Sequence, residues 1–189
     1  MAEVESLADR LKEREDAIDV LVNNAGCGWM ESFESFSEVG WDKVMDLNVK
    51  SPFFLTKALL PLLKKNARHE ATASVINIGS IAGICGSTDT LSYAPSKAAI
   101  HQMTRNLAAL LADDHIRVNA IAPGRFFSKM TEYASEDKAG YEKEIAMIPL
   151  HRWGGETDIA GIAVMLASPA GGFMTGQIVA VDGGMTVVR

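Results

Sequence analysis

Apolar and polar positions follow two patterns along the chain, one helical and the other typical of strands. Within residues 1–17, the stretch 2–16 repeats apolar side chains at helical spacing among charged ones, which predicts an amphipathic helix. Residues 18–26, IDVLVNNAG, form a short apolar run ending in asparagines and glycine, as in a buried parallel strand that opens into a loop. The same patterns alternate further on, and they predict helices at 41–66, 92–112 and 157–167 and strands at 73–80, 116–124 and 177–184.

This alternation predicts the fold class. Strands separated by helices of about ten residues or more indicate an α/β protein with a Rossmann-like, doubly wound parallel sheet that binds ligands at the carboxyl ends of its strands. Three of the expected strands end in polar or glycine residues, at 23–26, 79–80 and 123–124, so we expect these residues to meet along one edge. Pro52 predicts a break or kink within the second helix.

Composition narrows the class of protein. The chain of 189 residues, 48% hydrophobic and 22% charged, is expected to form a single domain, 1–189. A net charge of −6 without a cluster of lysines and arginines predicts no nucleic-acid partner and favours a small-molecule substrate. No apolar run of 18 residues and no signal peptide are found, so no membrane partner is expected. Cys27 and Cys85 have no metal-binding or disulfide spacing, so we expect no metal and a reducing, cytoplasmic location.

The stretch SYAPSK, residues 92–97, carries the first candidate chemistry. Tyr93 and Lys97 are four residues apart, which places both side chains on one helical face, about 5–6 Å apart at Cβ. Pro95 is tolerated only in a first turn, so the helix is expected to begin near Ser92 with Tyr93 at its mouth. Taken alone, such a pair is more often a surface contact worth about 0.2–0.5 kcal/mol.

Five elements together change that interpretation. They are NNAG at 23–26, Asn48, Ser80 thirteen residues before Tyr93, the YxxxK of Tyr93 and Lys97, and APG at 122–124. In this order they resemble the short-chain dehydrogenase/reductase family, and the resemblance runs from about residue 18 to 184. The C-terminal stretches RFFSKMT, IPLHRWG and MTGQIVAVDGG are similar to ketoacyl reductases, including those of the rhamnolipid-pathway type.

The predicted chemistry is that of an NAD(P)-dependent oxidoreductase, which reduces a carbonyl or oxidises a secondary alcohol. A phenol has a reference pKa of about 10, and we expect Lys97 to lower the pKa of Tyr93 so that it works as an acid and base. Ser80 is expected to donate a hydrogen bond to the same substrate oxygen. The resemblance implies that Asn48 holds a water linking Lys97 to solvent.

The resemblance also implies the cofactor contacts. Taken alone, the NNAG segment and the Pro-Gly pair could each be explained as a simple turn. In the family they lie beside the adenosine-side ribose and the nicotinamide, respectively, and Lys97 bonds the nicotinamide ribose. The implied NAD or NADP contacts are Asn24, Ala25, Gly26, Asn48, Tyr93, Lys97, Pro123, Gly124 and Ser128.

Residues 125–150 have weaker periodicity, with aromatic and methionine side chains, including Met130 and Tyr133, dispersed among charges, which predicts a mobile substrate lid. Trp153 is expected to pack in the core, and the four histidines share no ligand spacing, so no role is assigned to them. The resemblance implies a homodimer or homotetramer built on the helices at 41–66 and 92–112.

One family feature is missing from the sequence. No GxxxGxG or GxGxxG precedes residue 23, whereas the family opens with a strand, a glycine-rich turn and a helix. About 60 residues of the usual fold are absent, so the domain is expected to be N-terminally truncated, with the strand at 18–23 as a sheet edge. The sequence then does not indicate whether NAD or NADP is preferred, because the residue that selects between them lies in the absent region. The alternative function is a catalytically impaired truncated paralogue that serves as a binding or oligomerisation module.

Overall fold

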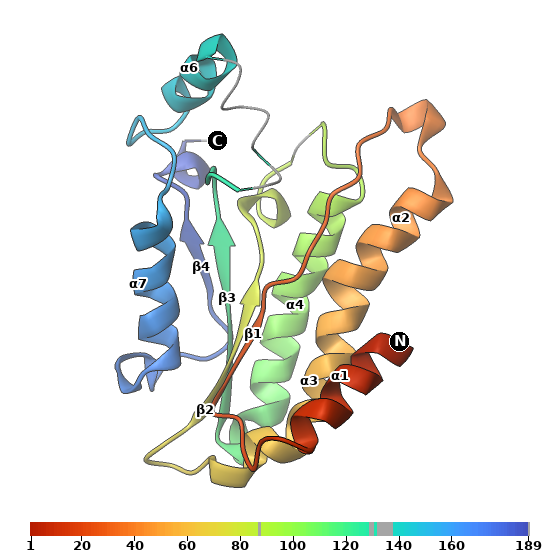
Figure 1. The fold of residues 1–189 in the computed structure, drawn as a ribbon. Helices are drawn as coiled ribbons and strands as arrows, with labels where there is room; N and C mark the ends of the chain where they lie inside the picture. Colours follow the sequence, from red (N-terminus) through yellow and green to blue (C-terminus); the bar gives the residue numbers. More distant parts are fainter. Residues whose placement is uncertain (87, 129–130, 132–137, 189) are drawn as a thin grey trace.

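The computed structural model describes residues 1–86, 88–128, 131 and 138–188. Its centre is a four-stranded, all-parallel sheet in the order β1-β2-β3-β4 (Figure 1). The strands are β1 (Val20–Asn23), β2 (Ala73–Ile78), β3 (Ile116–Pro123) and β4 (Ile178–Val181). The four predicted strands and the parallel sheet are therefore confirmed, although each strand is shorter than its apolar run.

Helices cover both faces of this sheet, as expected for a doubly wound fold. Figure 1 shows α1, α3 and α4 on one face and α7 on the other, with α6 beyond the carboxyl edge. The predicted helices are confirmed, with the first ending earlier than its pattern. They correspond to α1 (Ala2–Lys12), α2 (Glu38–Met45) with α3 (Ser51–Asn66), α4 (Tyr93–Leu111) and α7 (Glu156–Ala167). The structure adds α6 (Lys138–Ala146), which the sequence did not predict as a helix.

The two faces of β2 bury alternate side chains, because successive strand residues point to opposite sides. Val75 packs in a cluster with Leu63 of α3 on one side. Ile76 packs against Ile121 and against Leu166 of α7 on the other side. All five side chains are at most 1% exposed, so β2 is a central strand with a core on each face.

The interruption expected at Pro52 takes the form of a π turn. Between α2 and α3, the π turn η2 (Asp46–Lys50) keeps the chain helical, and the amide of Ser51 bonds back to the carbonyl of Asp46. Pro52 has no amide hydrogen, so a regular α-helical bond to the carbonyl of Asn48 cannot form there. The π turn accommodates the proline without ending the helix, and it carries Asn48.

β1 lies at one end of the sheet, as expected, and Val20 and Val22 are 37% and 49% exposed. None of the helices in the described part of the chain is long and apolar enough to cross a membrane.

Candidate active site

The parallel register brings the polar strand ends to one edge of the sheet. Asn23 pairs with Asn77, Ile78 with Ile121, and Pro123 with Val181, so the segments that follow these strands leave from the same side (Figure 1). The predicted convergence of 23–26, 79–80 and 123–124 is thus confirmed.

Ser80 and Tyr93 meet at this edge. Ser80 caps the 3-10 turn η3 (Ile81–Gly83) that follows β2, and its Oγ accepts the amide of Ala82 at 3.1 Å. Tyr93 is the first residue of α4, with Pro95 in the first turn as the sequence predicts. The Ser80 side chain lies near enough to the Tyr93 phenol for hydrogen bonding between them to lower the pKa of Tyr93. Two hydroxyl groups held in this way can bind one carbonyl oxygen between them.

Lys97 lies one helical turn beyond Tyr93. Its Nζ is 5.4 Å from the centre of the Tyr93 ring and donates to the carbonyl of Ile78 at 2.7 Å. The side chain is only 4% exposed, and burial lowers the pKa of Lys97 from 10.5 to about 8, with Cys27 acting in the opposite direction. An ammonium has three donors, so Nζ keeps hydrogens for further partners.

The pKa of Tyr93 differs from the sequence expectation. Burial raises it above 10.0, and the hydrogen bond from Ser80 lowers it only in part. The expectation that Lys97 lowers the pKa of Tyr93 is therefore wrong, because the pKa lies above its ordinary value and desolvation outweighs the hydrogen bonding from Ser80. The phenol consequently keeps its proton at neutral pH.

Asn48 connects η2 to this site and is 1% exposed. Its Oδ1 accepts the amide of Cys27 at 2.9 Å, and its Nδ2 donates to the carbonyl of Cys27 at 2.9 Å and to Ser96 Oγ at 3.0 Å. The side chain thus ties the loop after β1 to α4. The role of Asn48 in holding a water that links Lys97 to solvent stays a prediction.

The loop after β1 has the open backbone that a ribose requires. Asn24, Ala25 and Gly26 are exposed. A Cβ built on Gly26 would lie 3.3 Å from Asn48 Oδ1 and 3.5 Å from Lys97 Nζ, so the glycine lets the backbone of this loop lie close to both side chains. Small residues, a cation and exposed backbone fit a nicotinamide nucleotide, although these contacts remain predictions.

The Pro123–Gly124 turn follows β3. The amide of Gly124 bonds to the carbonyl of Val181 at 2.9 Å, and a Cβ at Gly124 would lie 2.7 Å from Asp182 Cα. Close approach of two backbones therefore requires glycine here. Ser128 is exposed, and its Oγ is 3.2 Å from Thr131 Oγ1. The structure brings Pro123 and Gly124 to the edge, and the cofactor contact of Ser128 stays a prediction.

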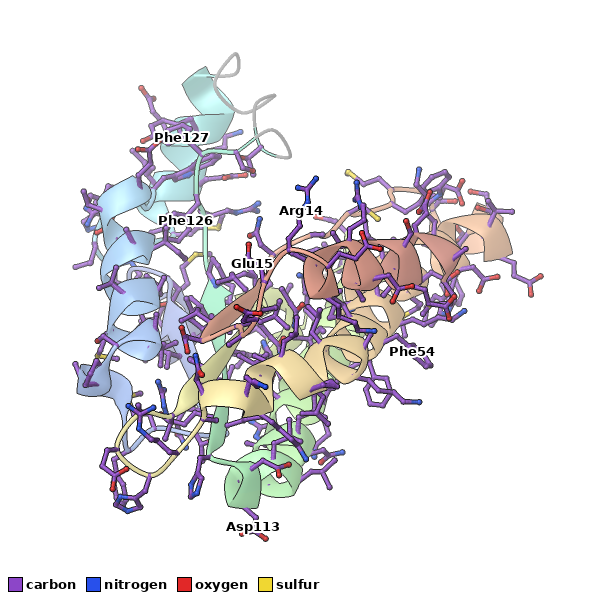
Figure 2. The ribbon with its side chains drawn as sticks, turned by 60° about the horizontal axis from the view of Figure 1, so that its bottom comes forward. Arg14, Glu15, Phe54, Asp113, Phe126 and Phe127 are labelled. Carbon is purple, nitrogen blue, oxygen red and sulfur yellow. The ribbon has the colours of Figure 1, made fainter. Side chains whose placement is uncertain are left out.

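The predicted lid is partly described. Met130 and Tyr133 lie outside the described residues. Phe127, labelled in Figure 2, belongs to this segment. Its ring centre lies 4.7 Å from that of Trp153 and 6.0 Å from that of Tyr141 on α6. Trp153 is 4% exposed and shares a cluster with Ile81, next to Ser80, which confirms its packing role. Phe127 itself is 58% exposed.

The sequence interpretation did not identify a buried polar network beneath the site. Asn23 Nδ2 donates to Asn77 Oδ1 at 2.8 Å and to Thr56 Oγ1 at 3.2 Å, and Asn77 Nδ2 donates to Thr104 Oγ1 at 2.9 Å. These bonds join β1 and β2 to α3 and α4. The available signal was asparagine within two otherwise apolar strands, since buried polar groups need partners.

The fold and these side chains define the class of nicotinamide-dependent oxidoreductases built on a parallel sheet. A family model described as enoyl-(acyl carrier protein) reductase matches residues 1–186. The 3-oxoacyl-(acyl-carrier-protein) reductase of rhamnolipid biosynthesis from Pseudomonas aeruginosa is 48% identical over 179 residues, 94% of this chain and 70% of that protein. The chain therefore belongs to the short-chain dehydrogenase/reductase family, whose members are NAD(P)-dependent oxidoreductases.

Solved structures agree with this assignment. The active-site complex of Pseudomonas aeruginosa RhlG with NADP matches with a TM-score of 0.95 and 47% identity, covering 98% of this chain and 73% of that one. A gluconate 5-dehydrogenase from Burkholderia cenocepacia, in complex with NADP and tartrate, matches with a TM-score of 0.90 and 31% identity, covering 98% of this chain and 71% of that one.

Proposed function

We propose that this protein reduces the ketone of a 3-oxoacyl thioester to a secondary alcohol with NADPH. The observation that carries the proposal is the group formed by Ser80, Tyr93 and Lys97 at the carboxyl edge of the sheet. The similarity to the reductase of rhamnolipid biosynthesis supports the substrate, and the NADP in the two solved relatives supports the cofactor.

In this mechanism the protein supplies the proton and holds the oxygen. Ser80 and Tyr93 bind the carbonyl oxygen by hydrogen bonds, and the bound nicotinamide supplies a hydride. Tyr93 gives its proton to the oxygen, for which its raised pKa is suitable because the phenol is protonated at neutral pH. Lys97 is charged below a pH of about 8 and stabilises the phenolate that remains.

Tyr93 must then regain its proton. We assign this step to a water held by Asn48 that links Lys97 to solvent; Pro52 lacks the amide hydrogen that a regular α-helix would donate to the carbonyl of Asn48. The side-chain bonds of Asn48 to Cys27 and Ser96 hold this part of the π turn in place.

The cofactor would be held by residues at the same edge. Lys97 has free donors for the nicotinamide ribose, and the exposed backbone of 24–26 can approach the other ribose closely. Pro123 and Gly124, at the end of β3, would contact the nicotinamide, and the hydroxyl of Ser128 would bind the same end of the cofactor. Phe127, exposed on an aromatic cluster, gives the predicted lid at 125–150 an apolar surface for an acyl chain.

We also infer a homodimer or homotetramer formed through α3 and α4. Phe53, Phe54 and Leu110 on these helices are 40%, 37% and 70% exposed, and Figure 2 shows Phe54 projecting outward from the helix face. Exposed apolar side chains of this size favour a protein interface. Two free cysteines, Cys27 and Cys85, support a reducing compartment such as the cytoplasm.

The substrate is tested with the purified 189-residue chain, NADPH and two carbonyl compounds. We expect saturable binding of NADPH by fluorescence titration and steady oxidation of NADPH with a 3-oxoacyl thioester. The second compound is a 5-keto sugar acid, which represents the chemistry of the gluconate relative. We expect it to react at least about tenfold more slowly than the 3-oxoacyl thioester, since the exposed lid side chain, Phe127, is apolar. Binding that does not saturate at millimolar NADPH would contradict the proposal and favour a non-enzymatic binding module.

A further inference from the structure

His101 is a buried imidazole that the mechanism above does not use. It lies on α4, one turn beyond Lys97, and is only 4% exposed. Its Nε2 is enclosed and has no hydrogen-bond partner among the described groups. Buried polar atoms are normally paired, so an unpaired ring nitrogen next to a candidate active site needs an explanation.

The ring fills the space between the two glycines that flank Ser80. A Cβ built on Gly79 would lie 2.3 Å from His101 Nε2, and one built on Gly83 would lie 2.9 Å from His101 Cε1. The imidazole also lies near enough to the backbone of Gly83 for hydrogen bonding there to act on the pKa of His101. The ring therefore contacts the chain on both sides of Ser80, at the end of β2 and at the end of η3.

His101 is uncharged in this position. The pKa of His101 is lowered from 6.5 to about 4; burial is the largest cause, Arg105 and Lys97, both on α4, act in the same direction, and hydrogen bonding to the backbone of Gly83 opposes them. The two glycines that lie against the ring, Gly79 and Gly83, carry no charge. A neutral planar ring can fill a narrow space between two backbones without placing a second cation next to Lys97.

We propose that His101 is a positioning residue that holds Ser80 in hydrogen-bonding distance of the Tyr93 phenol. It does not touch the substrate. It fixes the backbone before and after Ser80 and so fixes the hydroxyl that binds the carbonyl oxygen. The expected effect on kcat rests on the proposed function. The effect on the position of Ser80 does not, because it involves only residues of this chain.

The test compares His101→Leu with Ser80→Ala, and uses His69→Gln, on an exposed histidine, as the control. The NMR signal of Tyr93 Cζ, assigned with Tyr93→Phe, reports the hydrogen bond to the phenol without any turnover. We expect this signal to move in the same direction in His101→Leu and Ser80→Ala and to stay in place in His69→Gln. We also expect kcat to fall about 10–100-fold in His101→Leu, with the dissociation constant of NADPH unchanged within twofold, because small displacements of a positioned group cost rate.

A Tyr93 signal that stays at its wild-type position in His101→Leu would overturn the inference. His101→Gln provides the same comparison if the leucine variant does not fold. If the wild type binds no NADPH and turns over no substrate, the proposed function fails, and the Tyr93 signal still decides the role of His101.

A second measurement uses the two glycines. Gly79→Ala should lower kcat because its Cβ meets the imidazole, and Gly79→Ala with His101→Ala should recover part of that loss. Gly83→Ala should not be recovered by His101→Ala, because its Cβ would also lie 2.7 Å from backbone atoms of Lys97 and Ala98. Equal recovery in both pairs, or recovery in neither, would contradict a specific contact at Gly79.

Discussion

At the scale of single residues, burial controls the acid–base chemistry of the site. Burial raises the pKa of Tyr93 and lowers that of Lys97 to about 8, although the two side chains are one turn apart. Both shifts favour the neutral form of the side chain. The apoprotein therefore presents a protonated phenol beside an ammonium that is retained at neutral pH, which is the combination that ketone reduction requires.

This arrangement predicts the alkaline limit of activity. The value of kcat/KM for ketone reduction should fall as the pH rises through about 8, because kcat/KM reports the free enzyme and Lys97 loses its charge there. A flat profile between pH 7 and 9 would contradict the assignment of Lys97.

The same shift makes a prediction about stability. Because the ordinary pKa of a lysine is 10.5 and that of Lys97 in the folded protein is about 8, the unfolded chain binds this proton more tightly between the two values. The free energy of unfolding of the wild type, relative to Lys97→Met, should therefore rise by up to about 3 kcal/mol from pH 8 to 10.5. Denaturant titrations of both proteins measure it, and a constant difference over this range would show that Lys97 is not desolvated.

At the scale of elements, strand ends and helix starts place the side chains. Ser80 caps η3 at the end of β2, Tyr93 opens α4, and Asn48 lies in the π turn before Pro52. Where the chain after β3 lies close to the chain after β4, at Gly124 beside Asp182, the sequence supplies glycine.

The role of Gly124 is tested against a glycine that has room. Gly124→Ala should destabilise the fold by about 1–3 kcal/mol, since its Cβ would lie 2.7 Å from Asp182 Cα. Gly161→Ala, inside α7 with nothing within 4 Å, should stabilise it by about 0.5–1 kcal/mol because alanine is the better helix former. Thermal unfolding of the two variants gives both values, and equal effects would show that space around Gly124 is not limiting.

The elements were also the part of the structure that the sequence could predict. Apolar periodicity identified all four strands, and the position of Pro95 correctly located the start of α4. Apolar periodicity could not predict the π turn at Asp46–Lys50, because this turn forms where the helix continues although Pro52 cannot donate a regular α-helical hydrogen bond. Nor could it predict the pKa direction of Tyr93 or the contact of His101 with Gly79, because both depend on what three-dimensional packing encloses.

At the scale of the whole molecule, the carboxyl edge of the sheet and the outer face of α3 and α4 are two surfaces for which we propose different functions. The carboxyl edge gathers the candidate active site, with α6 above it, while α3 and α4 form an outer face with exposed aromatic residues (Figures 1 and 2). The interface proposed on that face would leave the edge free for cofactor and substrate.

The interface predicts the effect of one surface charge. Phe54→Glu should shift the protein toward the monomer in light scattering, because the buried phenyl ring of an interface would be replaced by a carboxylate. Phe33→Glu, at a phenylalanine that is 81% exposed in a short 3-10 turn, should leave the mass unchanged. A wild type that is monomeric at all concentrations would contradict the interface.

The central claim, that Tyr93 donates the proton in NADPH-dependent ketone reduction, is tested most directly by the turnover of Tyr93→Phe. The account predicts that kcat falls by about 10²–10⁴-fold with the dissociation constant of NADPH nearly unchanged, while the control Tyr141→Phe on α6 keeps at least half of the wild-type rate. A Tyr93→Phe enzyme with wild-type turnover would contradict the account.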